Sequence, residues 1–242
     1  MHNFQICDPI FERPVGRKHR ALARLARWLG IRAELVPLPD ETTQMCTAEQ
    51  RINLWHLAEQ VLAHRVPGDF VDIGCFDGRT SAFIASILAE HDPARAFHVY
   101  DSFEHNLGLS TNTREALLRH FESRRLPLPV IHAGRFESTL PSELPAPIAF
   151  AQLDCGIGAP PEFHASLITR CLGHIWPRLS PGAICVVQDY HDPASGSTSE
   201  NFYPFLKSTV DDFLAPHGVR AVALFSGKYS HGFFRKPGGR TA

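Results

Sequence analysis

Short apolar runs alternate with longer amphipathic segments through most of the 242-residue chain. The apolar runs predict strands at 69–74, 96–101, 128–132, 148–154 and 183–189, and a closing hairpin at 220–225 and 230–236 around Ser226-Gly227. The segments between them predict helices at 79–90, 112–122, 161–178 and 201–215, with another that begins at the capping box Thr47–Gln50. Because such alternation requires crossover connections, we expect an α/β fold with a doubly wound, mostly parallel sheet of about seven strands.

The N-terminal segment has a pattern of its own. Residues 18–29, KHRALARLARWL, place Leu22, Leu25 and Leu29 at helical spacing, with arginines on the opposite side. Residues 36–46, VPLPDETTQMC, have the composition of a linker. The expected organisation is an N-terminal helical extension or lid with its linker at 1–46, followed by one α/β domain at 47–242.

The composition narrows the class of protein. A composition of 44% apolar and 20% charged residues is typical of a globular domain. The sequence has no apolar run long enough to span a bilayer, and we expect no secretory signal. Six cysteines without a CxxC pair indicate reduced thiols, so we expect a cytoplasmic protein.

Charge is spread unevenly over the chain. Seven of the 24 basic residues lie within residues 13–33, a segment that contains no acidic residue. The rest of the chain therefore contains 17 basic and 25 acidic residues. A basic segment on an acidic body suggests docking onto that body, onto a twin subunit or onto an anionic partner. We expect a homo-oligomer, most simply a dimer, with no membrane or nucleic-acid partner.

The stretch GDFVDIGCFDGRTS at 68–81 has the form of a strand, a glycine turn and a helix start. A dinucleotide loop would read G-x-G-x-x-G, whereas here Phe76 stands between Gly74 and Gly78 at the place of a middle glycine. Asp72 and neighbouring acids would oppose the charge of a pyrophosphate. S-adenosylmethionine carries a sulfonium and an ammonium and no phosphate. The acids therefore favour this cofactor over NAD.

Two neighbouring positions support the same cofactor. Thr80 and Ser81, at the helix start, could receive its carboxylate. Asp101 ends the strand AFHVYD 23 residues after Gly78, at the distance where an acid binds vicinal ribose hydroxyls. The alternative is that Asp101 caps the following segment, SFEHN.

Two later strand ends are expected to meet. Asp154 ends IAFAQLD, and Gln188 with Asp189 ends AICVVQD. Their oxygens form a set suited to Mg²⁺, Mn²⁺ or Ca²⁺, and such an ion could lower the pKa of a substrate hydroxyl. Alternatively, Asp154 is a general base or a hydrogen-bond acceptor for substrate. Among the histidines, His191 is the best placed to act as a base.

These residues, taken together, resemble the macrocin O-methyltransferase family, a branch of the class I S-adenosylmethionine-dependent methyltransferases that tailor bacterial natural products. The resemblance runs over about 47–236. It rests on VPGDFVDIGCFDGRTS, VYDSFE, GRFESTLP, the pair LD at 153–154, WPRLSPGAICVVQDY and FFRK.

The resemblance implies roles for matching positions. Asp72, Gly74 and Gly78 would line the methionine part of the cofactor, Asp101 would hold its ribose, and Phe136 would lie against its adenine. The complete expected cofactor set is Asp72, Gly74, Cys75, Gly78, Thr80, Ser81, Asp101, Ser102 and Phe136.

The resemblance also implies that Asp154 is a metal ligand that can double as a base, with Asp189 as a second ligand. The chain departs from the family here, because Gln188 replaces the first of two acids before the tyrosine. An acid and a tyrosine usually follow the LD strand, where this chain has Cys155-Gly156-Ile157-Gly158. The family's Gly-Leu-Pro after DSFE is replaced by His105-Asn106-Leu107.

The expected function is S-adenosylmethionine-dependent O-methylation of a hydroxyl on a small natural product, for example a sugar, assisted by a divalent metal such as Mg²⁺. The alternatives are a metal-independent relative that transfers a methyl or another group to N or O, and a non-catalytic cofactor-binding partner subunit. An NAD-dependent dehydrogenase is a more distant alternative.

Overall fold

The computed structural model describes residues 21–22, 24–25, 28–30, 46–106, 112–156, 160–195, 201–224 and 229–238. The chain divides into two compact units, Met1–Met45 and Cys46–Ala242. In the first, the described helical positions carry the exposed side chains of Leu22, Leu25 and Trp28. Most of the expected linker and the Ser226-Gly227 turn lie outside the described residues.

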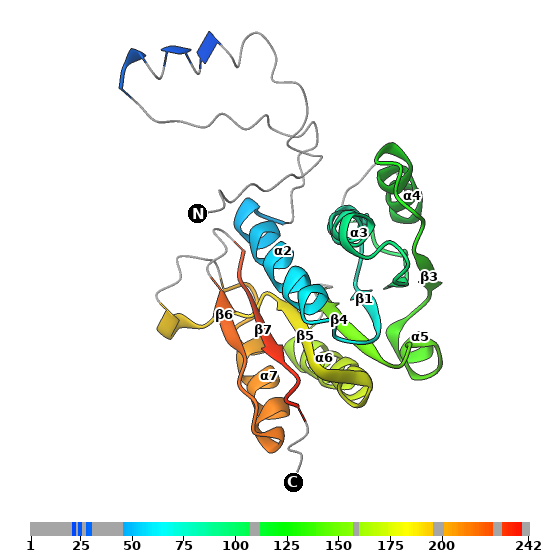
Figure 1. The fold of residues 1–242 in the computed structure, drawn as a ribbon. Coiled ribbons are helices and arrows are strands. Elements are labelled where there is room, and N and C mark those ends of the chain that lie inside the picture. Colours follow the sequence, from blue (N-terminus) through cyan, green and yellow to red (C-terminus); the bar gives the residue numbers. More distant parts are fainter. Residues whose placement is uncertain are drawn as a thin grey trace. The chain divides into compact units, whose positions relative to one another are not determined.

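The second unit is built on one seven-stranded sheet (Figure 1). Its strands are β1 (Asp69–Ile73), β2 (Phe97–Asp101), β3 (Val130–Ala133), β4 (Ile148–Leu153), β5 (Leu179–Gln188), β6 (Val222–Leu224) and β7 (His231–Arg235). Their order is β3-β2-β1-β4-β5-β7-β6, in which the five strands from β3 to β5 pair in parallel and β7 is antiparallel to both of its neighbours, β5 and β6. The predicted doubly wound, mostly parallel α/β sheet is confirmed.

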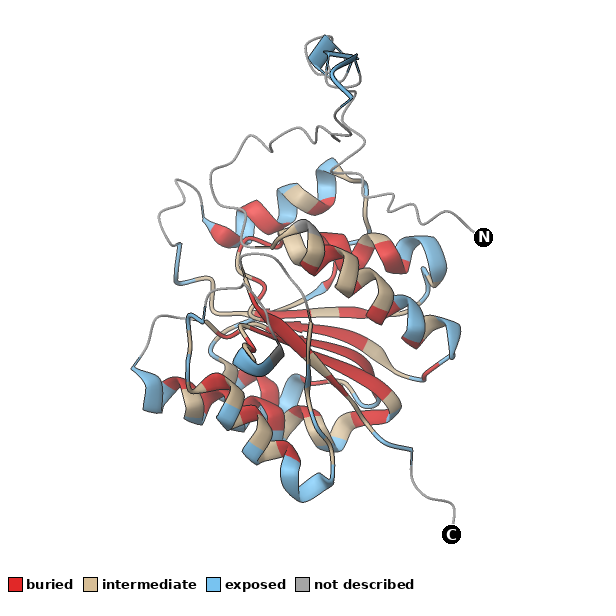
Figure 2. Cartoon of the chain, turned by 90° about the vertical axis from the view of Figure 1, so that its left-hand side faces the viewer, coloured by how far each residue is buried: buried red, intermediate tan, exposed pale blue. Residues whose placement is uncertain are grey.

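Helices cover both faces of this sheet. They are α2 (Ala48–Ala63), α3 (Arg79–His91), α4 (Thr113–Ser123), α5 (Phe136–Glu143), α6 (Pro161–Ile175) and α7 (Leu206–Leu214), with short 3₁₀ turns at Trp176–Arg178, Pro193–Ser195 and Ala215–His217. The helices α2, α3 and α4 are neighbours, as are α5, α6 and α7, and Figure 2 shows the buried sheet between two helical layers. No helix in the described part of the chain combines the length and apolar character needed to cross a bilayer.

The hydrophobic pattern explains why the centre of the sheet is so well buried. Every residue of β4 is buried, and so are all of β1 except Asp69. Strands covered on both faces are expected to be apolar throughout rather than alternating. On the flank, α2 begins with the predicted capping box, in which the Thr47 side chain accepts from the Gln50 amide and the Gln50 side chain accepts from Thr47 N–H.

Two helices differ from the sequence prediction. The pattern did not predict α5, which has only eight residues and contains Pro141 in its interior. The helix predicted from 201 instead begins at Leu206, after Pro204. The short stretch before α7, which contains Tyr203, is therefore not helical.

The strand order reverses between β1 and β4, since β1 is followed by β2 on one side of the sheet and β4 by β5 on the other. Ligands of doubly wound sheets bind beyond the carboxyl ends of the strands at such a point. The carboxyl ends of β1, β2, β4 and β5 therefore define the candidate site.

Candidate active site

The glycine turn after β1 is held tightly against the end of β4. Gly74 has φ +90° and Gly78 has φ +78°, a left-handed region that favours glycine. A β-carbon at Gly74 would collide with the backbone carbonyl of Asp154. The Asp154 amide donates to the Ile73 carbonyl at 2.8 Å. The turn thus holds the carboxyl ends of β1 and β4 side by side.

Asp72 lies on β1, two residues before Gly74, and is fully buried. The Ser81 hydroxyl donates to Asp72 Oδ2 at 2.6 Å, while Asp72 Oδ1 is buried with no hydrogen-bond partner among the described residues. Burial raises the pKa of Asp72 to about 7; the Ser81 bond opposes this rise and the charge of Asp101 adds to it. A buried carboxylate with one unsatisfied oxygen is suited to a cationic ligand.

Asp101 connects the turn after β1 to the segment after β2. Its Oδ2 accepts the Phe76 amide and its Oδ1 accepts the Phe103 amide, each at 2.8 Å. Burial raises the pKa of Asp101, and these backbone hydrogen bonds oppose the rise. Asp101 therefore caps the segment that follows β2, which was the alternative role considered for it. Its predicted contact with ribose can use the remaining lone pairs of the same oxygens.

Asp154 and Asp189 interact electrostatically at the ends of β4 and β5. Burial raises the pKa of Asp154 well above its usual value, and the negative charges of Asp189, Asp72 and Asp101 raise it further. Burial also raises the pKa of Asp189, to about 6. Four carboxylates are thus concentrated at one edge of the sheet, and positive charge brought there would stabilise their ionised forms.

The third predicted metal ligand is already engaged. Gln188 is buried, and its Oε1 accepts a hydrogen bond from Gln50 Nε2 at 2.9 Å. Within the described ranges, no group of three or more His, Cys, Asp and Glu side chains is placed to hold a metal ion. The expected set of Asp154, Gln188 and Asp189 contains only two side chains of these types, so it stays a prediction.

The remaining predicted residues lie in varied surroundings. Thr80 is half-buried in the first turn of α3, and His191 is half-buried after Tyr190. Cys75 is buried, and burial raises the pKa of its thiol, which is consistent with apolar packing. The Ser102 hydroxyl accepts the Glu104 amide at 3.3 Å.

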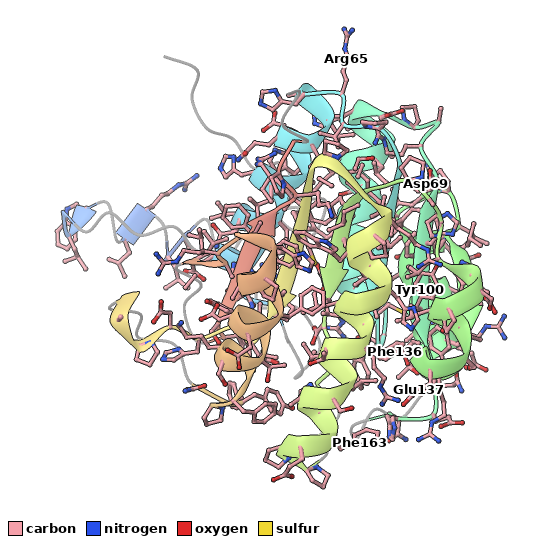
Figure 3. All side chains as sticks on the ribbon, turned by 90° about the horizontal axis from the view of Figure 1, so that it is seen from below. Arg65, Asp69, Tyr100, Phe136, Glu137 and Phe163 are labelled. Atoms are coloured by element: carbon pink, nitrogen blue, oxygen red, sulfur yellow. The ribbon has the colours of Figure 1, made fainter. Side chains whose placement is uncertain are left out.

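Phe136 lies where α5 meets α6. It lines a pocket of about 110 Å³, and its neighbour Glu137 pairs with Arg170 at 3.3 Å. Figure 3 shows Phe136 and Glu137 beside α6. Its predicted contact with adenine stays a prediction.

Two residues near Asp154 were not expected. His164 on α6 is buried; burial lowers the pKa of its imidazole and the backbone of Cys155 opposes this. Tyr203 packs edge-on against His164, with ring centroids 4.6 Å apart. Neither follows a strand directly, so a search of strand ends could not find them.

Comparison with known proteins finds similarity to methyltransferases. The macrocin-O-methyltransferase (TylF) family matches residues 12–126, and a methyltransferase domain family matches residues 71–190. The curated 8-demethyl-8-(2,3-dimethoxy-alpha-L-rhamnosyl)-tetracenomycin-C 4'-O-methyltransferase of Streptomyces olivaceus is 31% identical over 160 residues. This alignment covers 57% of the chain and 59% of the relative, so the chain spans less than two thirds of that protein.

Solved structures agree on the fold. The O-methyltransferase NovP superposes with a TM-score of 0.66 at 21% identity, covering 83% of this chain and 84% of NovP. The O-methyltransferase TomG from Streptomyces achromogenes, solved in complex with S-adenosylmethionine, superposes with a TM-score of 0.55 at 16% identity, covering 96% and 91%. The sequence matches and the seven-stranded fold point the same way: over residues 12–126 the chain is similar to the macrocin-O-methyltransferase family, and its sheet has the fold of the solved O-methyltransferases.

Proposed function

We propose that the protein is an S-adenosylmethionine-dependent O-methyltransferase that acts on a hydroxyl of a small natural product. The observation that carries the proposal is the cluster of the buried or half-buried carboxylates Asp72, Asp101, Asp154 and Asp189 at the carboxyl edge of the sheet, where burial raises the pKa of each. A phosphate-bearing cofactor would add negative charge here. A cofactor with a sulfonium and an ammonium adds positive charge instead.

The residues present fit this cofactor. Asp72 offers a buried oxygen without a partner, which suits the ammonium group. Asp101 is fixed by two backbone hydrogen bonds and can direct its free lone pairs at the ribose hydroxyls. Bound S-adenosylmethionine would supply an electrophilic methyl group on its sulfonium sulfur.

The chain's own part in the reaction is to position the acceptor and remove its proton. The acceptor oxygen forms a bond to the methyl carbon as the sulfur–carbon bond breaks, and the sulfur keeps the electron pair as a neutral thioether. The hydroxyl proton goes to Asp154, which stands at the end of β4 beside the glycine turn. His191 is a second candidate acceptor for this proton.

A divalent metal at Asp154 and Asp189 is the second version of this proposal. The negative charge of Asp189 raises the pKa of Asp154, so a cation between the two carboxylates would be favourable. The neutral Gln188 disfavours it, because an amide in place of an acid leaves only two charged ligands, and one lone pair of its oxygen already accepts a hydrogen bond from Gln50. We therefore assign proton removal to the carboxylates themselves and route no step through a metal.

The acceptor class follows from the relative's name, which describes a methyltransferase for a rhamnosyl group on tetracenomycin. We infer a glycosylated natural product, or its sugar, as acceptor. The test is an assay with methyl-labelled S-adenosylmethionine and a panel of rhamnosides, polyketide glycosides and simple phenols.

Binding titrations with S-adenosylmethionine and with NAD separate the proposal from a dehydrogenase. Tight binding of the former with no transfer to any acceptor would instead support a non-catalytic partner subunit.

A further inference from the structure

Gly156 lies two residues after Asp154, and side chains from other segments of the chain approach its α-carbon. A β-carbon at Gly156 would meet the hydroxyl oxygen of Tyr203 at 3.2 Å and Asp189 Oδ2 at 3.4 Å. The phenol of Tyr203 and the carboxylate of Asp189 therefore approach the same point. This point lies beside the carboxylate that we assign as proton acceptor.

The ring of Tyr203 is held by aromatic contacts. It packs edge-on against His164, with interplanar angle 89°, and against Phe205, with centroids 6.0 Å apart at 68°. His164 is itself buried and contacts Phe205 edge-on at 5.5 Å. Edge-to-face contacts of this kind fix ring orientation. The ring is thus held by two aromatic contacts, and its hydroxyl oxygen approaches Gly156, as Asp189 Oδ2 does.

The hydroxyl adds a chemistry that the acids lack. Ionised Asp154 and Asp189 can only accept hydrogen bonds, whereas a phenol both donates and accepts and stays neutral near pH 7. An acceptor molecule that gives one hydroxyl to the acids can therefore place a neighbouring oxygen against a donor. A sugar ring, with oxygens on adjacent carbons, has this arrangement. A phenol with an isolated hydroxyl does not.

We propose that Tyr203 binds the acceptor, holding the oxygen next to the reacting hydroxyl, and that it selects sugar-like acceptors over isolated hydroxyls. Gly156 takes part by leaving room for the Tyr203 hydroxyl. The inference rests on the proposed function, since it assumes that an acceptor hydroxyl meets the acids.

The test compares Tyr203→Phe with wild type. The probes are S-adenosylhomocysteine for cofactor affinity, and methyl α-L-rhamnoside and a glycosylated tetracenomycin as acceptors, with a simple phenol as the isolated hydroxyl. We expect Tyr203→Phe to raise the KM of the sugar acceptor about tenfold, the effect of one lost hydrogen bond, with kcat changed less. Affinity for S-adenosylhomocysteine and the KM of a phenol that serves as substrate stay within twofold.

Gly156→Ala provides an independent variant. The backbone at Gly156 is outside the left-handed region, so alanine is tolerated there, but its β-carbon crowds the Tyr203 hydroxyl. We expect the same rise in KM, and the double variant with Tyr203→Phe to be no worse than either single one, because both remove the same contact.

Matched controls exist for each substitution. Tyr100→Phe removes a hydroxyl that donates to the Glu143 carbonyl at 2.8 Å, and Gly173→Ala adds a β-carbon with nothing within 4 Å. Neither should change the acceptor KM. If wild type transfers methyl and Tyr203→Phe has wild-type KM and selectivity, the inference is wrong while the proposed function stands. If wild type transfers methyl to no acceptor, the proposed function itself is wrong, and the inference falls with it.

Discussion

The side-chain amide of Gln50 on α2 donates a hydrogen bond to the side-chain oxygen of Gln188 at the end of β5, over 2.9 Å. Both residues are buried, 2% and 8% exposed. A glutamine at 188 can be satisfied by this neutral partner, whereas a carboxylate there would add a fifth acid to an already crowded edge. The contact links the helix that begins at the capping box with the strand end that carries Asp189.

Turnover should not depend on an added metal, because we assign proton removal to the carboxylate of Asp154 itself and the neutral Gln188 adds no charge to hold a metal. We expect enzyme treated with EDTA and desalted to keep its rate within twofold. The measurement is methyl transfer before and after chelation and after Mg²⁺ is restored. A rate lost on chelation and recovered with Mg²⁺ would show that the carboxylate pair works through a metal.

Replacing Gln50 by alanine should destabilise the fold by about 1–3 kcal/mol, because Gln188 Oε1 would be buried without its donor and the Thr47 N–H would lose its capping-box acceptor. The measurement is urea unfolding at neutral pH. Gln60→Ala is the matched control, since Gln60 lies on the same helix with an exposed side chain. Equal effects at both positions would mean that the buried hydrogen bond has no special weight.

Binding of S-adenosylmethionine should strengthen as pH rises. The pKa of Asp72 in the empty site is raised to about 7 by burial, so below that pH its carboxyl is largely protonated, while the cationic cofactor favours the ionised form. We expect affinity to increase about tenfold from pH 6 to pH 8, with proton release on binding.

Calorimetry in buffers of different ionisation enthalpy measures both the affinity and the proton release. Asp72→Asn should bind more weakly and lose this pH dependence, whereas Asp92→Asn, at the other end of α3, should behave as wild type. A wild-type affinity that stays flat or falls over this range would contradict the assignment of Asp72 to the cofactor.

Gly74→Ala should lower stability by at least about 2 kcal/mol and abolish cofactor binding. Its left-handed φ disfavours alanine, and the added β-carbon collides with the Asp154 carbonyl. Thermal unfolding and a cofactor titration measure the two effects. Gly173→Ala, within α6 and without a close neighbour, should be neutral or slightly stabilising. A Gly74→Ala protein that binds the cofactor normally would disprove the tight packing of the turn.

The sequence was most informative where the chemistry is local. The alternation of strands and helices predicted the sheet, and Thr47 with Gln50 predicted the start of α2, because each signal is complete within a few residues. The helix α5 was not predicted, because it has only eight residues and one of them is a proline.

The missed parts of the site depend on contacts between distant segments. Tyr203 and Asp189 both approach Gly156 only after β4, β5 and the stretch before α7 have been brought together. Similarly, the Gln50 side chain takes part both in the helix cap and in the contact with Gln188, and only the first has a sequence signature. Pairing of this kind is set by tertiary packing, and residue spacing alone does not reveal it.

The central claim is that Asp154 accepts the proton of a hydroxyl as it is methylated. The most direct measurement is single-turnover transfer of a labelled methyl group from S-adenosylmethionine to a rhamnoside, in wild type and in Asp154→Asn, with cofactor affinity measured alongside. We predict a methyl ether and S-adenosylhomocysteine in equal amounts from wild type, and a rate at least about 100-fold lower in the variant, with cofactor affinity much less affected. Undiminished transfer by Asp154→Asn would contradict the account.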